Sequence, residues 1–322
     1  MVLKPIAAIT TVALAAVLAS AGAQGQAYPN RDIRFICAFP AGSGADIIVR
    51  HFAEQARPII NRTIIVENKV GAGGNIAVEY AARAKPDGYT IFVHAATAVA
   101  ASMHLYKKPP VDVGKSFQIA GTINRQPFML VVDAKSPHKT VAELMAAMKQ
   151  KGAQATYATA APTGKIMGEI FKDVGKLQAV EVNYKSAPDS INELVSGKLD
   201  YGMHDPVFSL AQQREGRLRI LAISTGKRLD ATPDLPTMTE LGVPMDLTGW
   251  WAALVPAGTP KPVVDQINKW FTAMVSSPET KKFLNGFGGD QLIETPEVAQ
   301  ARFLKDIAAW GEYVRVAKIQ PQ

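Results

Sequence analysis

The sequence has few of the residues that bind metals or form disulfides. Cys37 is the only cysteine among 322 residues, so neither an internal disulfide nor a cysteine-based metal site can form. The five histidines show none of the short spacings that are typical of a zinc site. We therefore expect no metal and no cofactor, and we expect Cys37 to be a buried, inert thiol in the first apolar strand.

Complete nucleotide-binding and hydrolase motifs are also missing. Gly42 and Gly44 fit the first two positions of a dinucleotide fingerprint, but Ile47 stands where the third glycine belongs. Ser224 follows an apolar strand, as in a nucleophile elbow, yet no histidine follows His204 to complete the order Ser–acid–His. The net charge of +7 is scattered and lacks a stacking-aromatic motif, so we expect no nucleic-acid partner.

No segment after residue 27 is long and apolar enough to span a membrane, since about 20 apolar residues are needed. At the N-terminus, Lys4 is followed by an apolar run over residues 6–18 and then by small residues, in the order of a signal peptide. We expect residues 1–27 to be removed, with cleavage near Ala23 or Ala27, and the mature chain to be exported.

Apolar runs of strand length alternate with helical periods along the remaining chain. This alternation predicts an α/β fold with mainly parallel sheets flanked by helices. The predicted strands are 33–39, 63–67, 90–94, 117–122, 128–132, 179–184, 200–203 and 218–224. Capping boxes predict helix starts at Thr140 and Ser190, and proline near the first turn predicts helices over 262–276 and 296–314.

Two segments that interrupt the strand and helix patterns predict where the chain passes between two lobes. One is residues 122–127, and the other is the proline-rich region 232–262. A chain that leaves a lobe and later returns gives two lobes joined by a two-strand hinge, with a ligand site between them. We expect lobe 1 to comprise residues 28–126 plus 248–322, and lobe 2 to comprise residues 127–247.

A small-residue turn enters a helix in each expected lobe. In the first, the strand that reaches Phe39 passes through Gly42-Ser43-Gly44 into a helix beginning at Asp46. In the second, residues 156–164 lead into a helical stripe that starts at Ile166. Helix starts offer unpaired N–H groups and favour negative charge, so the two turns together predict an anion site that needs no Arg or Lys.

Other polar residues near these turns have more than one interpretation. His204 and Asp205 end a strand-like run, where His204 can be either a ligand group or a structural hydrogen-bonding group. Arg125 can pair with a distal carboxylate or remain a solvated surface residue. If the protein is an enzyme, the candidate general bases are His94, His204, Asp46 and Asp205. Otherwise, we expect Asp46 to cap its own helix and orient the turn.

Several segments occur in the same order in one known family. They include Phe39-Pro-Ala-Gly-Ser-Gly-Ala-Asp46, Val66-Glu-Asn-Lys-Val-Gly-Ala-Gly-Gly-Asn75, Lys85-Pro-Asp-Gly-Tyr-Thr90, Pro233-Asp-Leu-Pro-Thr237 and Val255-Pro-Ala-Gly-Thr-Pro260. On these segments the chain resembles the Bug family, the periplasmic binding proteins of tripartite tricarboxylate transporters. The resemblance covers essentially the whole chain after residue 27, and it implies a two-lobed periplasmic binding protein of the type II fold.

The resemblance also implies the ligand and the residues that hold it. In the family, turns matching 39–46 and 159–164 grip one carboxylate, and segments matching Thr97 and Asp205 border the site. The expected ligand-binding residues are therefore Phe39, Ala41, Gly42, Ser43, Gly44, Ala45, Asp46, His94, Thr97, Thr159, Ala160, Ala161, Thr163, Gly164, His204 and Asp205.

The function implied is that of a monomeric, non-enzymatic periplasmic receptor that closes on a small mono- or dicarboxylate. Its expected partners are the membrane subunits of a tripartite tricarboxylate-type transporter or a sensor kinase. The alternatives are an exported hydrolase or isomerase that uses the same cleft, and a scaffolding protein without a small ligand. Aliphatic diacids, aromatic acids, hydroxy acids and amino acids all remain open as ligands.

Overall fold

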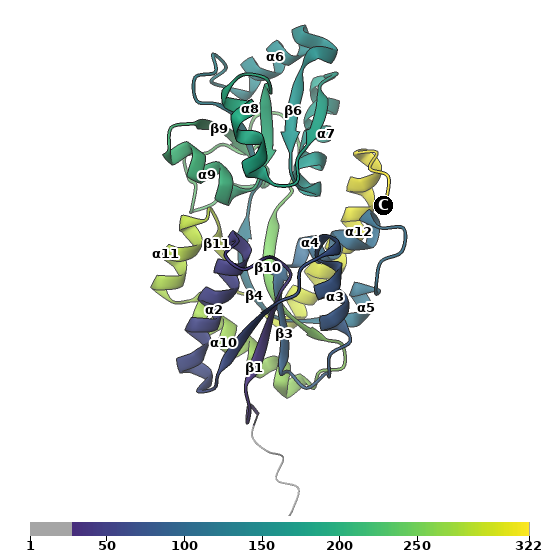
Figure 1. Ribbon diagram of the computed structural model, residues 1–322, viewed down its shortest axis with the longest axis vertical. Helices are drawn as coiled ribbons and strands as arrows, with labels where there is room; N and C mark the ends of the chain where they lie inside the picture. The colour runs from purple at the N-terminus through teal and green to yellow at the C-terminus, as the bar shows by residue number, and fades with distance from the viewer. Residues whose placement is uncertain (1–27, 322) are drawn as a thin grey trace, which may run out of the picture.

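The computed structural model describes residues 28–321, so the expected signal peptide lies outside the described residues. Two sheets, each with helices on both faces, form two lobes stacked along the long axis of the molecule (Figure 1). The expectation of a two-lobed α/β fold is confirmed. Within the described chain, no helix has the length and apolar character needed to cross a membrane.

The first sheet has six strands in the order β11-β4-β10-β3-β1-β2. Their bounds are β1 Ile33–Cys37, β2 Ile64–Asn68, β3 Thr90–Ala95, β4 Phe117–Gln126, β10 Gly249–Pro256 and β11 Asp290–Gln291. Strand β1 pairs in parallel with β2 and β3, whereas β10 runs antiparallel to both β3 and β4.

The second sheet has five strands in the order β7-β6-β8-β5-β9. Their bounds are β5 Met129–Asp133, β6 Thr156–Thr159, β7 Val180–Asn183, β8 Tyr201–His204 and β9 Leu218–Ile223. Strand β6 pairs in parallel with β7 and β8, and β5 runs antiparallel to β8 and β9.

Both sheets are thus mixed, which corrects the expectation of mainly parallel pairing within the confirmed fold. The antiparallel strands β10 and β5 are those nearest the crossings between lobes, and a strand entering from the other lobe runs against its neighbours. Every strand expected from the sequence overlaps an observed one, but β6, β10 and the short β11 were not predicted as strands. In β10, residues 249–256 lie inside the proline-rich region that we interpreted as a crossing.

The helices cover the sheet faces and supply the rest of the cores (Figure 1). On the first lobe they are α2 Gly44–Ile60, α3 Asn75–Ala82, α4 Ala96–Leu105, α5 Val113–Ser116, α10 Lys261–Val275, α11 Pro278–Gly286 and α12 Pro296–Val316. On the second lobe they are α6 Val141–Lys151, α7 Pro162–Gly175, α8 Ile191–Val195 and α9 Pro206–Arg214. Short 3₁₀ turns lie at Ala72–Gly74, Gly152–Gln154 and Ala187–Ser190.

Local sequence accounts for most helix starts. The predicted capping box at Thr140 is confirmed, with Glu143 completing it. The box predicted at Ser190 is wrong, since Ser186 and Asp189 form it one turn earlier and the Ser190 hydroxyl donates to the Ala187 carbonyl oxygen. The predicted helices near 262–276 and 296–314 are confirmed as α10 and α12.

Candidate functional site

The carboxyl ends of the parallel strands in the two sheets lie at the place where the chain crosses between lobes. In the first sheet, Trp251 of β10 pairs with Ala95 at the end of β3, and β4 also ends at this edge. Three residues after Gln126, β5 begins at Met129, which pairs with His204 at the end of β8. We call the carboxyl ends of β1–β3 and β6–β8, with the turns that follow them, the inter-lobe face.

The inter-lobe face contains all the site residues expected from the sequence. The first lobe contributes the turn from β1 into α2, together with His94 and Thr97 around the end of β3; the second contributes the turn from β6 into α7, together with His204 and Asp205 after β8. Topology thus gathers residues that lie more than 160 positions apart.

The two halves of this face approach each other closely at α2 and α9. A Cβ added at Gly44, the first residue of α2, would lie 3.6 Å from Cγ1 of Val207 in the first turn of α9. A Cβ added at Gly288, just before β11, would lie 2.7 Å from Leu210 and 3.0 Å from Pro206. First-lobe turns therefore already lie against the start of a second-lobe helix.

Ser43 and Asp46 fix the first turn. The helix begins at Gly44 rather than at the expected Asp46, because the Ser43 hydroxyl accepts a hydrogen bond from the Asp46 N–H at 3.2 Å. The Asp46 carboxylate is 1% exposed and accepts from the Gly42 N–H, Arg50 Nε and Asn68 Nδ2, each at 2.8 Å. The helix cap is thus Ser43, while Asp46 holds the turn in place.

The hydrogen bonds around Asp46 also determine its charge. Burial by itself raises the pKa of this carboxyl, but the bonds from Arg50, Asn68 and Gly42 outweigh burial and hold the pKa below its usual range. Asp46 is therefore an internally compensated carboxylate. Its lone pairs face donors of its own lobe.

Two helix starts on the inter-lobe face lack a side-chain cap. The N-cap residues of α4 and α7 are Ala95 and Ala161, neither of which can accept a hydrogen bond through its side chain. The first-turn N–H groups, including those of Thr97 in α4 and of Thr163 and Gly164 in α7, consequently have no partner within their helices. The start of α9, by contrast, is capped by Asp205, which accepts from the Phe208 N–H at 3.0 Å.

Packing and hydrogen bonds within the second lobe fix the turn from β6 into α7. Thr159 is fully buried and donates its hydroxyl hydrogen to Glu181 Oε1 at 2.6 Å, and Lys165 pairs with the other oxygen of Glu181 at 2.9 Å. A Cβ added at Gly164 would lie 2.4 Å from the Met203 carbonyl oxygen. Only glycine allows α7 to start this close to β8.

His94 lies on the first-lobe side beside three aromatic rings, those of Phe39, Phe92 and Trp251. Its ring centroid is 5.2 Å from that of Phe39 and 5.8 Å from that of Trp251, and both rings are stacked on it. Nδ1 lies 3.1 Å from the Ala95 carbonyl oxygen, which only accepts, so Nδ1 carries the proton. Burial lowers the pKa of His94 to about 4, against the opposing effect of the Ala95 bond, so the imidazole is neutral at pH 7.

His204 lies on the second-lobe side with 1% exposure. Its Nε2 is 3.1 Å from the Ser190 hydroxyl, whose own hydrogen goes to the Ala187 carbonyl oxygen at 2.7 Å. His204 therefore donates from Nε2, and Nδ1 is a buried acceptor without a partner in residues 28–321. Burial lowers the pKa of His204 to about 4 and raises the pKa of the neighbouring Asp205 carboxyl.

The structure gives Arg125 and Cys37 structural roles. Arg125 pairs with the buried Asp290 at 3.3 Å, which accounts for its position without a ligand. Cys37 is a buried free thiol, as expected.

The sequence patterns did not identify Trp251, whose buried indole N–H has no partner in the described chain and whose ring stacks on that of His94. The unpredicted strand β10 carries it, so no strand pattern directed attention to this residue.

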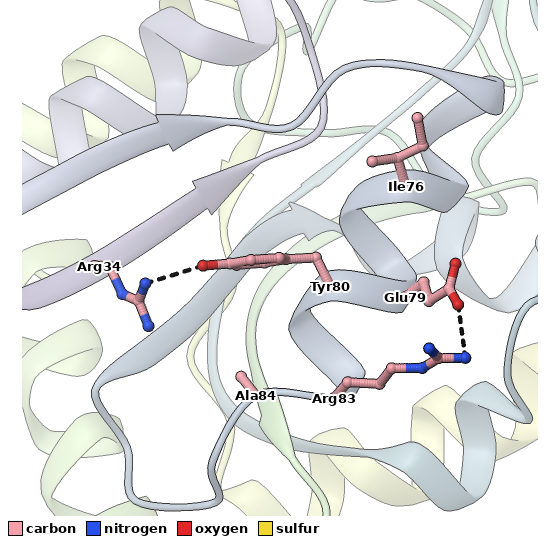
Figure 2. A pocket seen from close by; sticks show the side chains of 6 residues that line it. All are labelled: Arg34, Ile76, Glu79, Tyr80, Arg83 and Ala84. Atoms are coloured by element: carbon pink, nitrogen blue, oxygen red, sulfur yellow. Dashed lines mark hydrogen bonds and ion pairs between the residues drawn. The ribbon is translucent and has the colours of Figure 1, made fainter.

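Two hollows lie outside the inter-lobe face. One of about 390 Å³ is lined by Arg34, Ile76, Glu79, Tyr80, Arg83 and Ala84 (Figure 2). Arg34 donates to Tyr80 Oη at 2.9 Å and Arg83 pairs with Glu79 at 2.7 Å, so both guanidinium groups have partners. The other, of about 570 Å³, is lined by Tyr28, Asn30, Arg31, Pro86, Asp87, Tyr89, Pro260 and Val263. Neither hollow contains a predicted site residue.

Two α/β lobes joined by two crossings, with uncapped helix starts on facing edges, define the class of bilobal solute-binding receptors. The chain belongs to the tripartite tricarboxylate transporter family receptors, whose family model matches residues 48–316. The resemblance expected from the sequence is thereby confirmed, and with it the assignment as a periplasmic solute-binding receptor.

Individual relatives agree over nearly the full chain. Protein BugT of Bordetella pertussis is 26% identical over 292 residues, covering 89% of this chain and 90% of its own. The periplasmic binding protein BugD is 29% identical with a TM-score of 0.78, and Rpa4515 of R. palustris, solved with adipate, is 27% identical with a TM-score of 0.81. Each structure covers 92% of this chain and is itself covered completely.

Proposed function

We propose that this receptor captures a small organic mono- or dicarboxylate at the inter-lobe face and delivers it to the membrane subunits of a tripartite tricarboxylate-type transporter. Residues 28–126 plus 248–322 and residues 127–247 form the two lobes, which close around the ligand as a monomer. The mature protein is exported after removal of residues 1–27. It is a binding protein and not an enzyme.

The observation that carries this proposal is the pair of uncapped helix starts, α4 in one lobe and α7 in the other. Helix α4 follows β3, which pairs with the crossing strand β10, and α7 follows β6, which is separated from the crossing strand β5 only by β8. Both helices present first-turn N–H groups where negative charge is favoured. Hydrogen bonds to a charged group contribute about 1.5–3 kcal/mol each. A carboxylate that joins donors from two lobes therefore favours the closed form.

Two further points support a carboxylate and a non-enzymatic role. The 27% identical neighbour Rpa4515 was solved with adipate, a dicarboxylate. Three of the four candidate general bases are poorly suited to proton abstraction, since burial makes His94 and His204 weak bases and Asp46 is bonded to three donors of its own lobe. The fourth, Asp205, is engaged as the cap of α9, where it accepts from the Phe208 N–H. Recovery of unchanged ligand after binding, followed by NMR, tests this point, and conversion to a new species would contradict it.

The central test replaces Ala161 by aspartate. Ala161 has the extended backbone of an N-cap residue, so the introduced carboxylate would accept the first-turn N–H groups of α7 and compete with the ligand. We expect A161D to keep or raise the melting temperature while lowering affinity at least about tenfold, measured by calorimetry against acids chosen in a thermal-shift screen.

The matched control is Thr140→Asp. Thr140 is also an N-cap residue, but α6 follows the end of β5 that lies away from the crossing, so T140D adds the same charge far from the inter-lobe face. We expect T140D to bind like the wild type. Equal affinity of A161D and the wild type would remove α7 from the site and end the proposal.

A further inference from the structure

The two buried histidines occupy equivalent positions in the two lobes. Strand β3 lies between the parallel strand β1 and the antiparallel strand β10, and β8 lies between the parallel strand β6 and the antiparallel strand β5. His94 and His204 lie at or one residue before the carboxyl ends of these strands, opposite Ala252 and Met129. Each lobe thus brings one imidazole to the inter-lobe face.

Each imidazole is locked in one tautomer by a carbonyl group. At His94 the lock is direct, through the Ala95 carbonyl oxygen, and it leaves Nε2 as the acceptor nitrogen. At His204 the lock passes through the Ser190 hydroxyl, which is itself committed to the Ala187 carbonyl oxygen, and it leaves Nδ1 as the acceptor. The two rings therefore present opposite nitrogens as acceptors.

The acceptor nitrogen of His204 lies on the edge of the ring that is away from Gly202. A Cβ added at Gly202 would lie 2.7 Å from both Cδ2 and Nε2, so this edge of the ring lies back over the residue two positions earlier in β8. The opposite edge, which carries Nδ1, faces away from Gly202 and is buried. On the first lobe, Nε2 of His94 lies beside Gly74, 3.7 Å from where a Cβ would stand, in the turn that follows β2.

We infer that His204, with His94 as a second acceptor from the other lobe, selects a carboxylate that also carries a hydroxyl group. This inference rests on the proposed function, because the uncapped helix starts hold the carboxylate and the imidazole receives the hydroxyl. A buried acceptor nitrogen without a partner in the described chain disfavours a ligand that brings only carboxylate oxygens or methylene groups to it. A hydroxyl hydrogen satisfies that nitrogen without adding a second charge to the buried site.

A buried ammonium would need a negatively charged partner, whereas a hydroxyl would not, so the surrounding charges favour a hydroxyl as the donor. Burial lowers the pKa of each histidine to about 4, so neither ring provides charge for a ligand at pH 7. Asp46, the buried carboxylate of the first turn, already accepts hydrogen bonds from Gly42, Asn68 and Arg50 of its own lobe. The remaining carboxyl beside His204 is Asp205, which caps α9 and whose pKa is raised by burial.

The test compares acids that differ by a single hydroxyl: succinate with hydroxysuccinate, glutarate with 2-hydroxyglutarate, and butyrate with 3-hydroxybutyrate. We expect the wild-type protein to bind the hydroxy acid of at least one pair about tenfold or more tightly than its partner in calorimetry. If the protein binds both acids of a pair with equal affinity, and does so for every pair that it binds, the inference is overturned but the receptor function stays intact. If no acid of any pair or of the screening panel binds, the proposed function fails as well. Tighter binding of aminosuccinate than of hydroxysuccinate would overturn the choice of hydroxyl.

Substitutions at the two histidines provide matched controls of opposite sense. An Asn amide reaches the position of Nδ1 and a Gln amide the position of Nε2. H204N therefore keeps the acceptor and the hydroxy-acid preference, whereas H204Q keeps the bond to Ser190 and reduces the preference to about threefold or less. At His94 the pattern reverses, and H94Q keeps the acceptor that H94N removes. Retention of the full preference by H204Q would contradict the inference.

A measurement on the unmodified protein keeps the inference testable if a variant does not fold. Long-range ¹H–¹⁵N spectra distinguish the protonated and unprotonated nitrogens of each imidazole. We expect His94 protonated at Nδ1 and His204 protonated at Nε2. Addition of the preferred hydroxy acid should shift the His204 Nδ1 resonance, and its deoxy partner should not. The opposite tautomer at His204, or no selective shift, would overturn the inference.

Discussion

Replacing Asp46 by alanine tests whether the first turn is held by hydrogen bonds to a buried carboxylate. Asp46 is 1% exposed and accepts from the Gly42 N–H, from Asn68 and from Arg50, each at 2.8 Å. The substitution leaves these donors without their acceptor while the Ser43 cap of α2 remains. Its cost therefore measures how firmly the turn is fixed.

The expected magnitude follows from the exposure of the partners. The Arg50 side chain is 49% exposed, so its pairing with Asp46 is screened by solvent and contributes little. The bonds from Gly42 and Asn68 go to a charged acceptor and are worth about 1.5–3 kcal/mol each, reduced because water can reach the exposed turn. We expect D46A to lower the free energy of unfolding by about 2–4 kcal/mol, and the melting temperature by roughly 3–6 °C.

The effect of pH on this difference has a definite sign. Because the folded-state pKa of Asp46 lies below its unfolded value, the contribution is fully present above the unfolded pKa of about 3.9 and is lost as pH falls through the folded pKa. In urea unfolding, the difference between the wild type and D46A should be constant from about pH 5 to 8 and shrink below about pH 4. R50A should cost under about 1 kcal/mol. If R50A costs as much as D46A, the ion pair and not the hydrogen-bonded turn is decisive, and the reasoning is wrong.

Two other predictions concern packing around the strand ends. G164A should lower both stability and carboxylate affinity, because its Cβ would lie 2.4 Å from the Met203 carbonyl oxygen. The control G197A has nothing within 4 Å of its added Cβ and should lower stability alone, through its positive φ. Urea unfolding measures stability and calorimetry measures affinity, and normal affinity of G164A would show that the start of α7 need not be close to β8. Cys37 is 1% exposed, and burial raises the pKa of its thiol, so a disulfide reagent at about pH 8 should label it only after unfolding in urea. Rapid labelling of the native protein would contradict the burial of β1.

The sequence patterns located the two turns of the candidate site, because these turns lie at strand ends. An apolar strand followed by small residues and a helical period identifies such a turn locally, as at Ser43 and Gly164. The strands that the patterns missed are short or interrupted. Strand β6 has four residues and β11 has two, and β10 lies between prolines, where the signal of a crossing hides that of a strand.

The direction of a polar side chain was harder to predict than its position. Thr159 was expected among the ligand-binding residues, yet the hydrogen of its hydroxyl group goes to Glu181, 22 residues away in sequence. The tautomers of His94 and His204 likewise depend on carbonyl groups that only the folded chain brings near, directly or through Ser190. Such choices depend on tertiary neighbours, and no spacing within one strand encodes them.

The proposed site holds an anion with N–H groups from two lobes and without a full positive charge from either, and this arrangement has a consequence for release. In the open form, each lobe offers a ligand only its own helix start, α4 or α7, and water competes for the same donors. In the closed form the donors add, and water is displaced, so most of the affinity depends on closure. A receptor of this design retains its ligand while closed and loses most of its affinity when a transporter holds the lobes apart. A buried Arg on one lobe would keep much of the affinity in the open state, so introducing such a charge at the start of α7 would favour storage over delivery.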